Sequence, residues 1–214
     1  MSDVTVVIDL ILAFLGGFLV GSIPFGYVIG RWFYRTDIRK QGSGNIGAMN
    51  ALRTLGKTGA IAVLFLDALK GFAPVFAFSL SASWMDPDLR RVFLALVAAG
   101  AVLGHCYSPW LRFKGGKGVA TSFGAIFALS WQAGLVAVAG WIAGAALTSY
   151  SSVGSMLGSV LAPFALWVFT GSLPETSYGI FAAVLVLFKH RENIDRLRKG
   201  TEGPIRLGKK PGGP

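Results

Sequence analysis

The sequence has few charged residues and a single cysteine. Charged side chains make up 14% of the 214 residues, hydrophobic ones make up 53%, and the mean hydropathy is +0.61. That composition is too apolar for an ordinary soluble domain. The lone cysteine, Cys106, excludes an intramolecular disulfide, and no cluster of cysteine and histidine offers a zinc site. We therefore predict one integral membrane domain over residues 1–214, without a metal, in which Cys106 is a small apolar core residue.

Acidic residues are also scarce, because ten Asp and Glu stand against 20 Lys and Arg and the formal net charge is +10. In a soluble protein this excess would suggest nucleic acid binding. In a membrane protein, basic residues gather beside the bilayer and meet anionic headgroups. We therefore predict membrane lipids, and no nucleic acid, as partners. The amino terminus lacks a positive region and carries Asp3 and Asp9, so we interpret it as a retained first span and not a cleaved signal.

Uncharged runs predict an all-α, polytopic membrane protein with about seven transmembrane helices, because one crossing needs about 20 apolar residues. Pro24 is expected to kink or break the first helix near its inner end. A re-entrant hairpin over residues 118–148 is the alternative, and it would leave five full spans. The predicted crossings cover residues 10–30, 58–80, 92–111, 118–130, 133–148, 153–169 and 177–188.

Asp67 and Lys70 are the two charged residues inside the second predicted crossing. They are three apart and therefore share a helical face. Charges inside a membrane are costly and are usually paired or functional. We favour a structural pair that faces the bundle interior over a direct role in binding substrate.

Basic residues predict the orientation in the membrane. Of the 20 Lys and Arg, 17 lie in residues 31–57, in residues 112–117 or from residue 189 onward. Cytoplasmic loops carry such an excess, so the N-terminus is predicted outside and the C-terminus in the cytoplasm. Residues 81–91 have balanced charges and are expected to form an outer loop. Residues 199–214 are expected to form a flexible basic tail, with Arg196, Arg198 and Lys199 contacting lipid headgroups.

Two glycine-rich stretches with basic neighbours lie in the predicted cytoplasmic segments. The first is GSGNIGAMN at residues 42–50, and the second is GHCYSPWLRFKGGKGVAT at residues 104–121. A backbone without Cβ can turn its N–H groups toward an anion, and lysines add positive charge, so both stretches suit a phosphate. A loop that only orients two helices would look similar, but two such stretches favour a shared phosphate site. A short helix over residues 48–55 would let Arg53 close over the first stretch.

Two further polar segments lie on the predicted cytoplasmic side. TSYSSVGS at residues 148–155 is rich in hydroxyls, most of which we expect to bond their own helix backbone. His190 and Asn193 are three apart and therefore share a face beside the last predicted span.

Taken together, these motifs resemble the bacterial acyl-phosphate:glycerol-3-phosphate acyltransferase family, known as PlsY. The matching stretches are GSIPFGYVIGR, DIRKQGSGNIGAMN, GHCYSPWLRFKGGKGVAT and HRENIDRLRKGTEG, in that order along the chain. The resemblance implies a seven-helix bundle in the bacterial inner membrane, with its active site facing the cytoplasm. It also implies transfer of an acyl chain from acyl phosphate to the 1-hydroxyl of sn-glycerol 3-phosphate, giving lysophosphatidate and phosphate. Neither a cofactor nor an obligatory protein partner is expected.

The same resemblance implies the site residues. The catalytic group is His190, Asn193 and Ser152, and we favour orientation of the glycerol by His190 over a role as general base. In two places the chain departs from the family pattern, since Met49 replaces a common threonine and Ser149 a common arginine. The residues implied to bind substrate are Ser43, Gly44, Asn45, Gly47, Arg53, His105, Lys114, Gly115, Gly116 and Lys117.

A phosphate or organophosphate transporter is the alternative hypothesis. Transporters usually bind near the middle of the membrane, often between internally repeated halves. Here the candidate anion-binding groups gather on one predicted face, and the sequence has no convincing repeat. A structural or regulatory membrane subunit is a third hypothesis, and it leaves the paired glycine-rich stretches unexplained.

Overall fold

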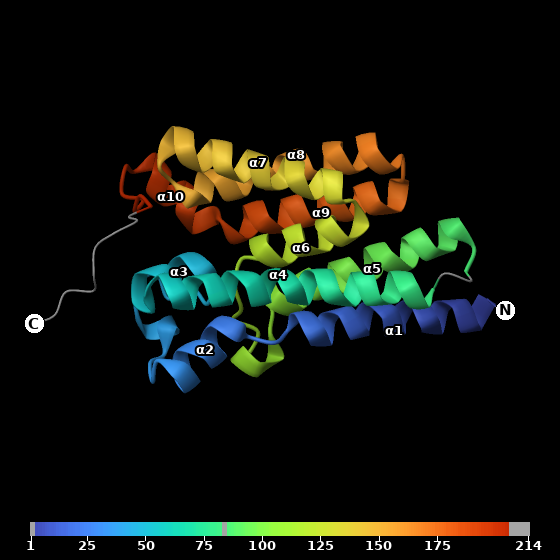
Figure 1. The fold of residues 1–214 in the computed structure, drawn as a ribbon, viewed down its shortest axis with the longest axis horizontal. Helices are drawn as coiled ribbons and strands as arrows, with labels where there is room; N and C mark the ends of the chain where they lie inside the picture. Colours follow the sequence, from blue (N-terminus) through green and yellow to red (C-terminus); the bar gives the residue numbers. More distant parts are fainter. Residues whose placement is uncertain (1–2, 83–84, 206–214) are drawn as a thin grey trace, which may run out of the picture.

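The computed structural model describes residues 3–82 and 85–205, and within them all regular secondary structure is helical (Figure 1). The predicted all-α class is confirmed. The α-helices are α1 (Asp3–Gly21), α2 (Phe25–Phe33), α3 (Ala48–Thr54), α4 (Gly56–Ser81), α5 (Pro87–Cys106), α6 (Val119–Leu129), α7 (Trp131–Thr148), α8 (Ser151–Thr170), α9 (Leu173–Lys189) and α10 (Arg191–Arg198). Two short 3-10 helices, η1 (Ile38–Lys40) and η2 (Pro109–Leu111), lie in the connections.

The predicted break at Pro24 is confirmed, because α1 ends at Gly21 and α2 begins at Phe25. Proline cannot donate a backbone hydrogen bond, so backbone groups before it need other partners. The carbonyl of Ser22 accepts a 2.6 Å hydrogen bond from Ser108 Oγ, and Trp110 Nε1 donates to Ser22 Oγ at 2.9 Å. The connection after α5 therefore holds this break in place.

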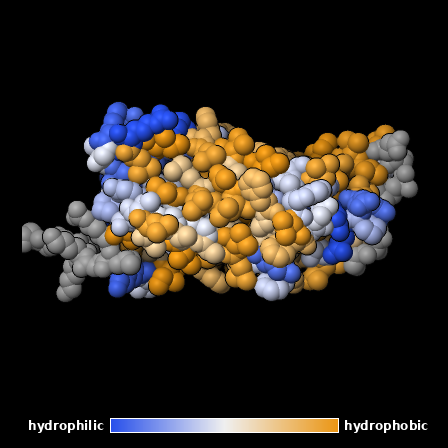
Figure 2. Space-filling view, turned by 90° about the horizontal axis from the view of Figure 1, so that it is seen from above, coloured by the Kyte–Doolittle hydropathy of each residue, from blue (hydrophilic) through white to orange (hydrophobic). Residues whose placement is uncertain are grey.

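Five segments of the described chain are long and apolar enough to cross a membrane. They are residues 4–33, α4, residues 87–111, α7 and α8. The other two predicted crossings are shorter helices, since α6 has 11 residues and α9 has 17. The prediction of seven crossings stays a prediction. Figure 2 shows mainly apolar residues along the middle of the visible face, with most hydrophilic residues nearer the ends.

One predicted boundary is wrong. Residues 81–91 were expected to be a loop, but α5 already begins at Pro87. The carboxylate of Asp86 accepts hydrogen bonds from the backbone N–H groups of Asp88 and Leu89, and proline is favourable at the first helical position. Residues 83–84 lie outside the described part of the chain.

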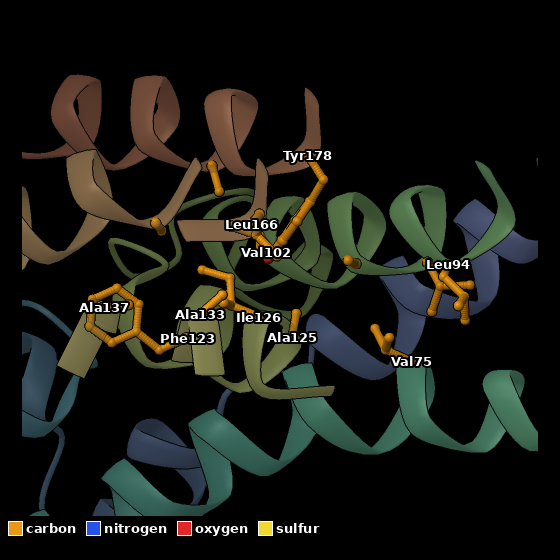
Figure 3. Packing of buried hydrophobic residues seen from close by; sticks show 14 of the residues in the cluster. Val75, Leu94, Val102, Phe123, Ala125, Ile126, Ala133, Ala137, Leu166 and Tyr178 are labelled. Atoms are coloured by element: carbon orange, nitrogen blue, oxygen red, sulfur yellow. The ribbon is translucent and has the colours of Figure 1, made fainter. Parts of the chain in front are cut away.

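Helix α6 lies between two groups of helices and packs against α4 on one side and α7 on the other (Figure 1). The main apolar core surrounds it, and Figure 3 shows Phe123, Ala125 and Ile126 of α6 with side chains from α5, α7 and α8. Cys106 is fully buried in this core, as predicted. Because α6 is short, its N-terminus lies nearer the middle of the bundle's long axis than α3 and α10 do (Figure 1).

Candidate active site

The predicted site residues gather around one cavity of about 910 Å³ at the end of the bundle that carries α3 and α10. Segments that are far apart in the sequence form its walls. Its polar lining includes Ser43, Asn45, Gly47, Arg53, His105, Lys117, Ser152, His190, Asn193, Arg196 and Glu202. The stretches predicted to face the cytoplasm therefore meet at one place.

The first glycine-rich stretch is built around the buried side chain of Asn50. Its amide nitrogen donates to the carbonyls of Ile38, Gln41 and Asn45, and its Oδ1 accepts from the backbone N–H of Ser43 at 2.8 Å. Gly42 has φ of 58° and lies too close to Asn50 Oδ1 for any larger residue. Asn50 therefore shapes the loop, and Ser43 is left exposed at the cavity.

Three polar residues of α8 and α10 meet at the carboxylate of Glu202, which follows α10. Its Oε1 accepts from Ser152 Oγ at 2.7 Å and from Asn193 Nδ2 at 2.6 Å, and its Oε2 accepts from Arg196 Nε at 2.7 Å. The amide oxygen of Asn193 accepts a hydrogen bond from Lys117 Nζ. These contacts join the second glycine-rich stretch to α8, α10 and the segment after α10.

Burial shifts the pKa values of Lys117 and His190, and hydrogen bonds shift that of Glu202. Burial, followed by the nearby charge of Arg196, lowers the pKa of Lys117 to about 8. Burial and the charge of Lys117 lower the pKa of His190 to about 4, so the imidazole is neutral near pH 7. For Glu202, burial opposes ionisation, but hydrogen bonds from Asn193, Ser152 and Arg196 outweigh it and lower the pKa.

The tautomer of His190 follows from its contact with the backbone. Its Nδ1 lies 2.8 Å from the carbonyl oxygen of Val186, which can only accept a hydrogen bond. Nδ1 therefore carries the proton, and Nε2 is the acceptor of the neutral ring. A hydroxyl in the cavity would find an acceptor there.

The floor of the cavity includes Asp67 and His105. Lys70 Nζ lies 2.8 Å from Asp67 Oδ1, and both side chains are almost completely buried, so the predicted pairing inside the bundle is confirmed. Among the described residues, no group of three or more His, Cys, Asp and Glu is arranged to hold a metal ion.

Some predicted binding residues do not line the cavity. Lys114 is exposed, and Gly44, Gly115 and Gly116 are also absent from the lining. Gly115 and Gly116 instead pack on the end of α5, where their N–H groups donate to the carbonyls of Cys106 and His105. A direct contact of these residues with substrate stays a prediction. Met49, one of the two departures from the family pattern, does line the cavity.

Glu202 was not among the predicted site residues, and Arg196 was predicted to lie elsewhere. Arg196 was expected at the lipid headgroups, but it pairs with Glu202 at the cavity. Residues 201–205, predicted as part of a flexible tail, lie against the cavity, and the Ile205 N–H donates to the Ser149 carbonyl at 2.8 Å. The rest of the predicted tail, residues 206–214, lies outside the described residues. An acidic residue in an otherwise basic tail was the one available signal for this contact.

Two hydroxyls in residues 148–155 bond their own helix backbone, as predicted. Thr148 and Ser155 donate to carbonyls four residues earlier in their own helices. Ser152 instead donates to Glu202. It is therefore the hydroxyl of this group that takes part in the polar cluster.

Comparison with known proteins agrees with this arrangement. A family model described as glycerol-3-phosphate acyltransferase matches residues 11–200. A protein of that name from Synechococcus sp. (strain JA-2-3B'a(2-13)) is 45% identical over 196 residues, covering 91% of this chain and 94% of its own. One from Mesorhizobium japonicum is also 45% identical, covering 92% of this chain and 96% of its own.

The fold has a counterpart among solved structures. The crystal structure of PlsY (YgiH), an integral membrane glycerol 3-phosphate acyltransferase, in its glycerol 3-phosphate form has a TM-score of 0.81 and 35% sequence identity. The match covers 94% of this chain and 96% of that one. Most of the residues that line the cavity fall within residues 11–200, the part that the family model matches, and the chain belongs to the glycerol-3-phosphate acyltransferase family.

Proposed function

We propose that this protein is a membrane acyltransferase that moves a fatty acyl chain from acyl phosphate to the 1-hydroxyl of sn-glycerol 3-phosphate. The observation that carries the proposal is one cavity that joins three features. It has basic residues for two phosphates, a neutral imidazole that can meet a hydroxyl, and an apolar wall. Lysophosphatidate and inorganic phosphate would be the products.

The anion-binding side of the cavity suits the phosphate of the acyl donor. The first glycine-rich stretch presents Ser43 and backbone groups, while Arg53 and Lys117 supply positive charge. Charge-assisted hydrogen bonds of this kind are stronger than neutral ones. Binding both substrates beside these cations would offset the repulsion between their phosphates.

The cluster on α8 and α10 suits glycerol 3-phosphate. Arg196 and Lys117 can attract its phosphate, and Asn193 and Ser152 are held in place by Glu202. His190 would accept a hydrogen bond from the glycerol hydroxyl through Nε2. Because its pKa is about 4, His190 is a weak base, and this supports orientation over proton abstraction.

The chemical step needs no covalent enzyme intermediate, because acyl phosphate is a mixed anhydride with a good leaving group. The glycerol oxygen would bond to the acyl carbon, and the bond from that carbon to the phosphate oxygen would break. The departing phosphate would take the proton of the hydroxyl. The protein contributes mainly proximity and charge stabilisation.

The apolar wall suits the acyl chain. Ile61 and Leu64 of α4 line the cavity and are 66% and 52% exposed, so this side is open to the surroundings of the bundle. Phe123 of α6 and Trp141 of α7 line the same region. A chain lying there would reach the bilayer while its phosphate stays among the basic residues. We place the protein in the bacterial inner membrane with this cavity facing the cytoplasm. The water-soluble glycerol 3-phosphate would enter the cavity from that side.

The test is phosphate release by purified protein in lipid, given palmitoyl phosphate with and without glycerol 3-phosphate. The Lys117→Ala variant is compared with Lys199→Ala, which removes an exposed lysine that does not line the cavity. We expect release that depends on glycerol 3-phosphate. It should fall roughly ten- to a hundredfold in Lys117→Ala, as loss of a charge-assisted hydrogen bond predicts. Lys199→Ala should match the parent protein.

Two results would contradict the proposal. One is that the folded protein releases no phosphate from palmitoyl phosphate when glycerol 3-phosphate is present. The other is accumulation of labelled glycerol 3-phosphate inside vesicles without any acyl donor, which would favour a transporter.

A further inference from the structure

The proposed reaction leaves a buried charged cluster unused. Asp67, Lys70 and His105 are at most 4% exposed, although Asp67 and His105 border the cavity. Lys70 pairs with Asp67, while His105 Nδ1 lies 3.7 Å from the same carboxylate oxygen, too far for a hydrogen bond. Buried charges are costly unless paired, so this cluster needs a reason to persist.

On one side, the cluster is tied to the break between α1 and α2. Lys70 Nζ donates a 2.7 Å hydrogen bond to the carbonyl of Ile23. Helix α2, which follows that break, packs so closely on the first glycine-rich stretch that a side chain at Gly26 would overlap the carbonyl of Ile46. The position of Lys70 is therefore linked to the position of the first stretch.

On the other side, the cluster supports the second glycine-rich stretch. The Gly116 N–H donates to the His105 carbonyl at 3.0 Å, and a Cβ at Gly116 would overlap His105 Nε2. The imidazole is thus enclosed between the Asp67 carboxylate and the backbone of Gly116. Lys117, which reaches Asn193 in the cavity, is the next residue.

We propose that Asp67, Lys70 and His105 form a positioning network that fixes the two glycine-rich stretches relative to each other. This inference rests on the proposed function, and it gives His105 a role through Gly116 and not as a direct contact to substrate. The alignment of two phosphate-binding elements is the kind of geometry on which a proximity-driven reaction depends.

The variants for the test are Asp67→Asn, His105→Gln and the double variant. Asp67→Asn keeps the size of the side chain and removes its charge. His105→Gln fills part of the space of the imidazole beside Gly116 but has no nitrogen at the position of Nδ1. Tyr178→Phe is the matched control, because it removes a different buried hydrogen bond, from Tyr178 to the Ser122 carbonyl, away from the cavity. Activity is expressed per folded protein.

If the network acts as a unit, each single variant should lower kcat/KM for palmitoyl phosphate by about tenfold or more, since small misplacements carry losses of up to about a hundredfold. The double variant should lose no more than the more severe single one. The KM for glycerol 3-phosphate should change less than kcat/KM for palmitoyl phosphate, because three of its proposed contacts, Ser152, Asn193 and Arg196, lie on α8 and α10. Tyr178→Phe should keep parental kinetics.

Three results would overturn the inference. Losses that multiply in the double variant would show that the two residues act independently. Unchanged kinetics per folded protein would make the cluster purely structural. A change confined to the KM for glycerol 3-phosphate would make His105 a direct contact.

A second readout separates this inference from the proposed function. Binding of inorganic phosphate, measured by calorimetry, should weaken about tenfold in both single variants, in line with the loss of a well-placed charged contact. If the parent protein binds phosphate but has no turnover, the proposed function fails while this readout still tests the network. Equal phosphate binding by parent and variants would contradict the network alone.

Discussion

His190 and Lys117 show how burial prepares a single residue for its task. Each loses part of its affinity for protons because the charged form is poorly solvated, and each lies in the same cluster. His190 becomes a neutral hydrogen-bond acceptor, while Lys117 remains a cation at neutral pH. Their different roles follow from their ordinary pKa values, which start far apart.

For His190 we predict that His190→Gln raises the KM for glycerol 3-phosphate by about fivefold or more, because an orienting hydrogen bond is worth about 1 kcal/mol. Steady-state kinetics at saturating palmitoyl phosphate would measure it. A drop in kcat alone, with the KM for glycerol 3-phosphate unchanged, would instead identify His190 as the general base.

For Lys117 we predict an alkaline limb in the pH profile. The lysine is charged below its folded-state pKa of about 8, so kcat/KM for palmitoyl phosphate should fall as the pH rises through that value. Lys117→Arg should move this limb upward by more than one pH unit, since arginine stays protonated. A limb near pH 8 that persists in the arginine variant would assign it to another group.

At the scale of elements, close backbone contacts fix the position of α1 against α5. Gly17 of α1 faces the backbone of Val97 in α5, with no space for a Cβ, whereas the neighbouring Gly16 has nothing within 4 Å of the same position. Small residues that let helix backbones approach are the usual means of packing inside membranes. The break after α1 and the second glycine-rich stretch both depend on where α1 and α5 lie.

The adjacent glycines provide a matched pair of variants. We predict that Gly17→Ala lowers the temperature of thermal inactivation by several degrees, because overpacking is destabilising by roughly 1–3 kcal/mol. Gly16→Ala should leave it unchanged or raise it slightly, since alanine favours a helix by about 1 kcal/mol. Equal effects of the two substitutions would show that α1 and α5 do not approach closely at Gly17.

At the scale of the whole molecule, features that depend on neighbouring residues could be predicted from the sequence. Contacts between residues far apart in the chain could not. The spacing of Asp67 and Lys70 predicted their pairing, and Pro24 predicted the break of the first helix. Glu202 could not be predicted in the same way, because its partner Ser152 is 50 residues away and the contact depends on the path of the chain after α10. Arg196 is only six residues from its partner Glu202, but its charge fits a lipid headgroup as well as a carboxylate, so the local pattern did not decide between them.

Local patterns also do not decide the number of membrane crossings. Helix α6 is too short to satisfy a length criterion, but it packs between longer helices, where a complete apolar surface is not required. Length alone therefore cannot separate seven crossings from the five-span alternative with a re-entrant hairpin.

Cysteine labelling can decide the topology, because Cys106 is the protein's one cysteine and is fully buried. We predict that an impermeant thiol reagent added outside intact cells labels Asp88→Cys and Gln132→Cys but not Lys199→Cys. In inverted vesicles, the reagent should label Lys199→Cys alone. No labelling of Gln132→Cys from outside would support the re-entrant hairpin, and labelling of Lys199→Cys from outside would reverse the orientation.

The acyl transfer itself is tested most directly by identifying the lipid product. Purified protein in lipid would receive palmitoyl phosphate or palmitoyl-CoA with glycerol 3-phosphate, and mass spectrometry would follow the products over time. We predict 1-palmitoyl-glycerol 3-phosphate in equal amount to the phosphate released, and only from palmitoyl phosphate. Formation from palmitoyl-CoA would contradict the proposed donor, and phosphate release without any acylated product would contradict the transfer.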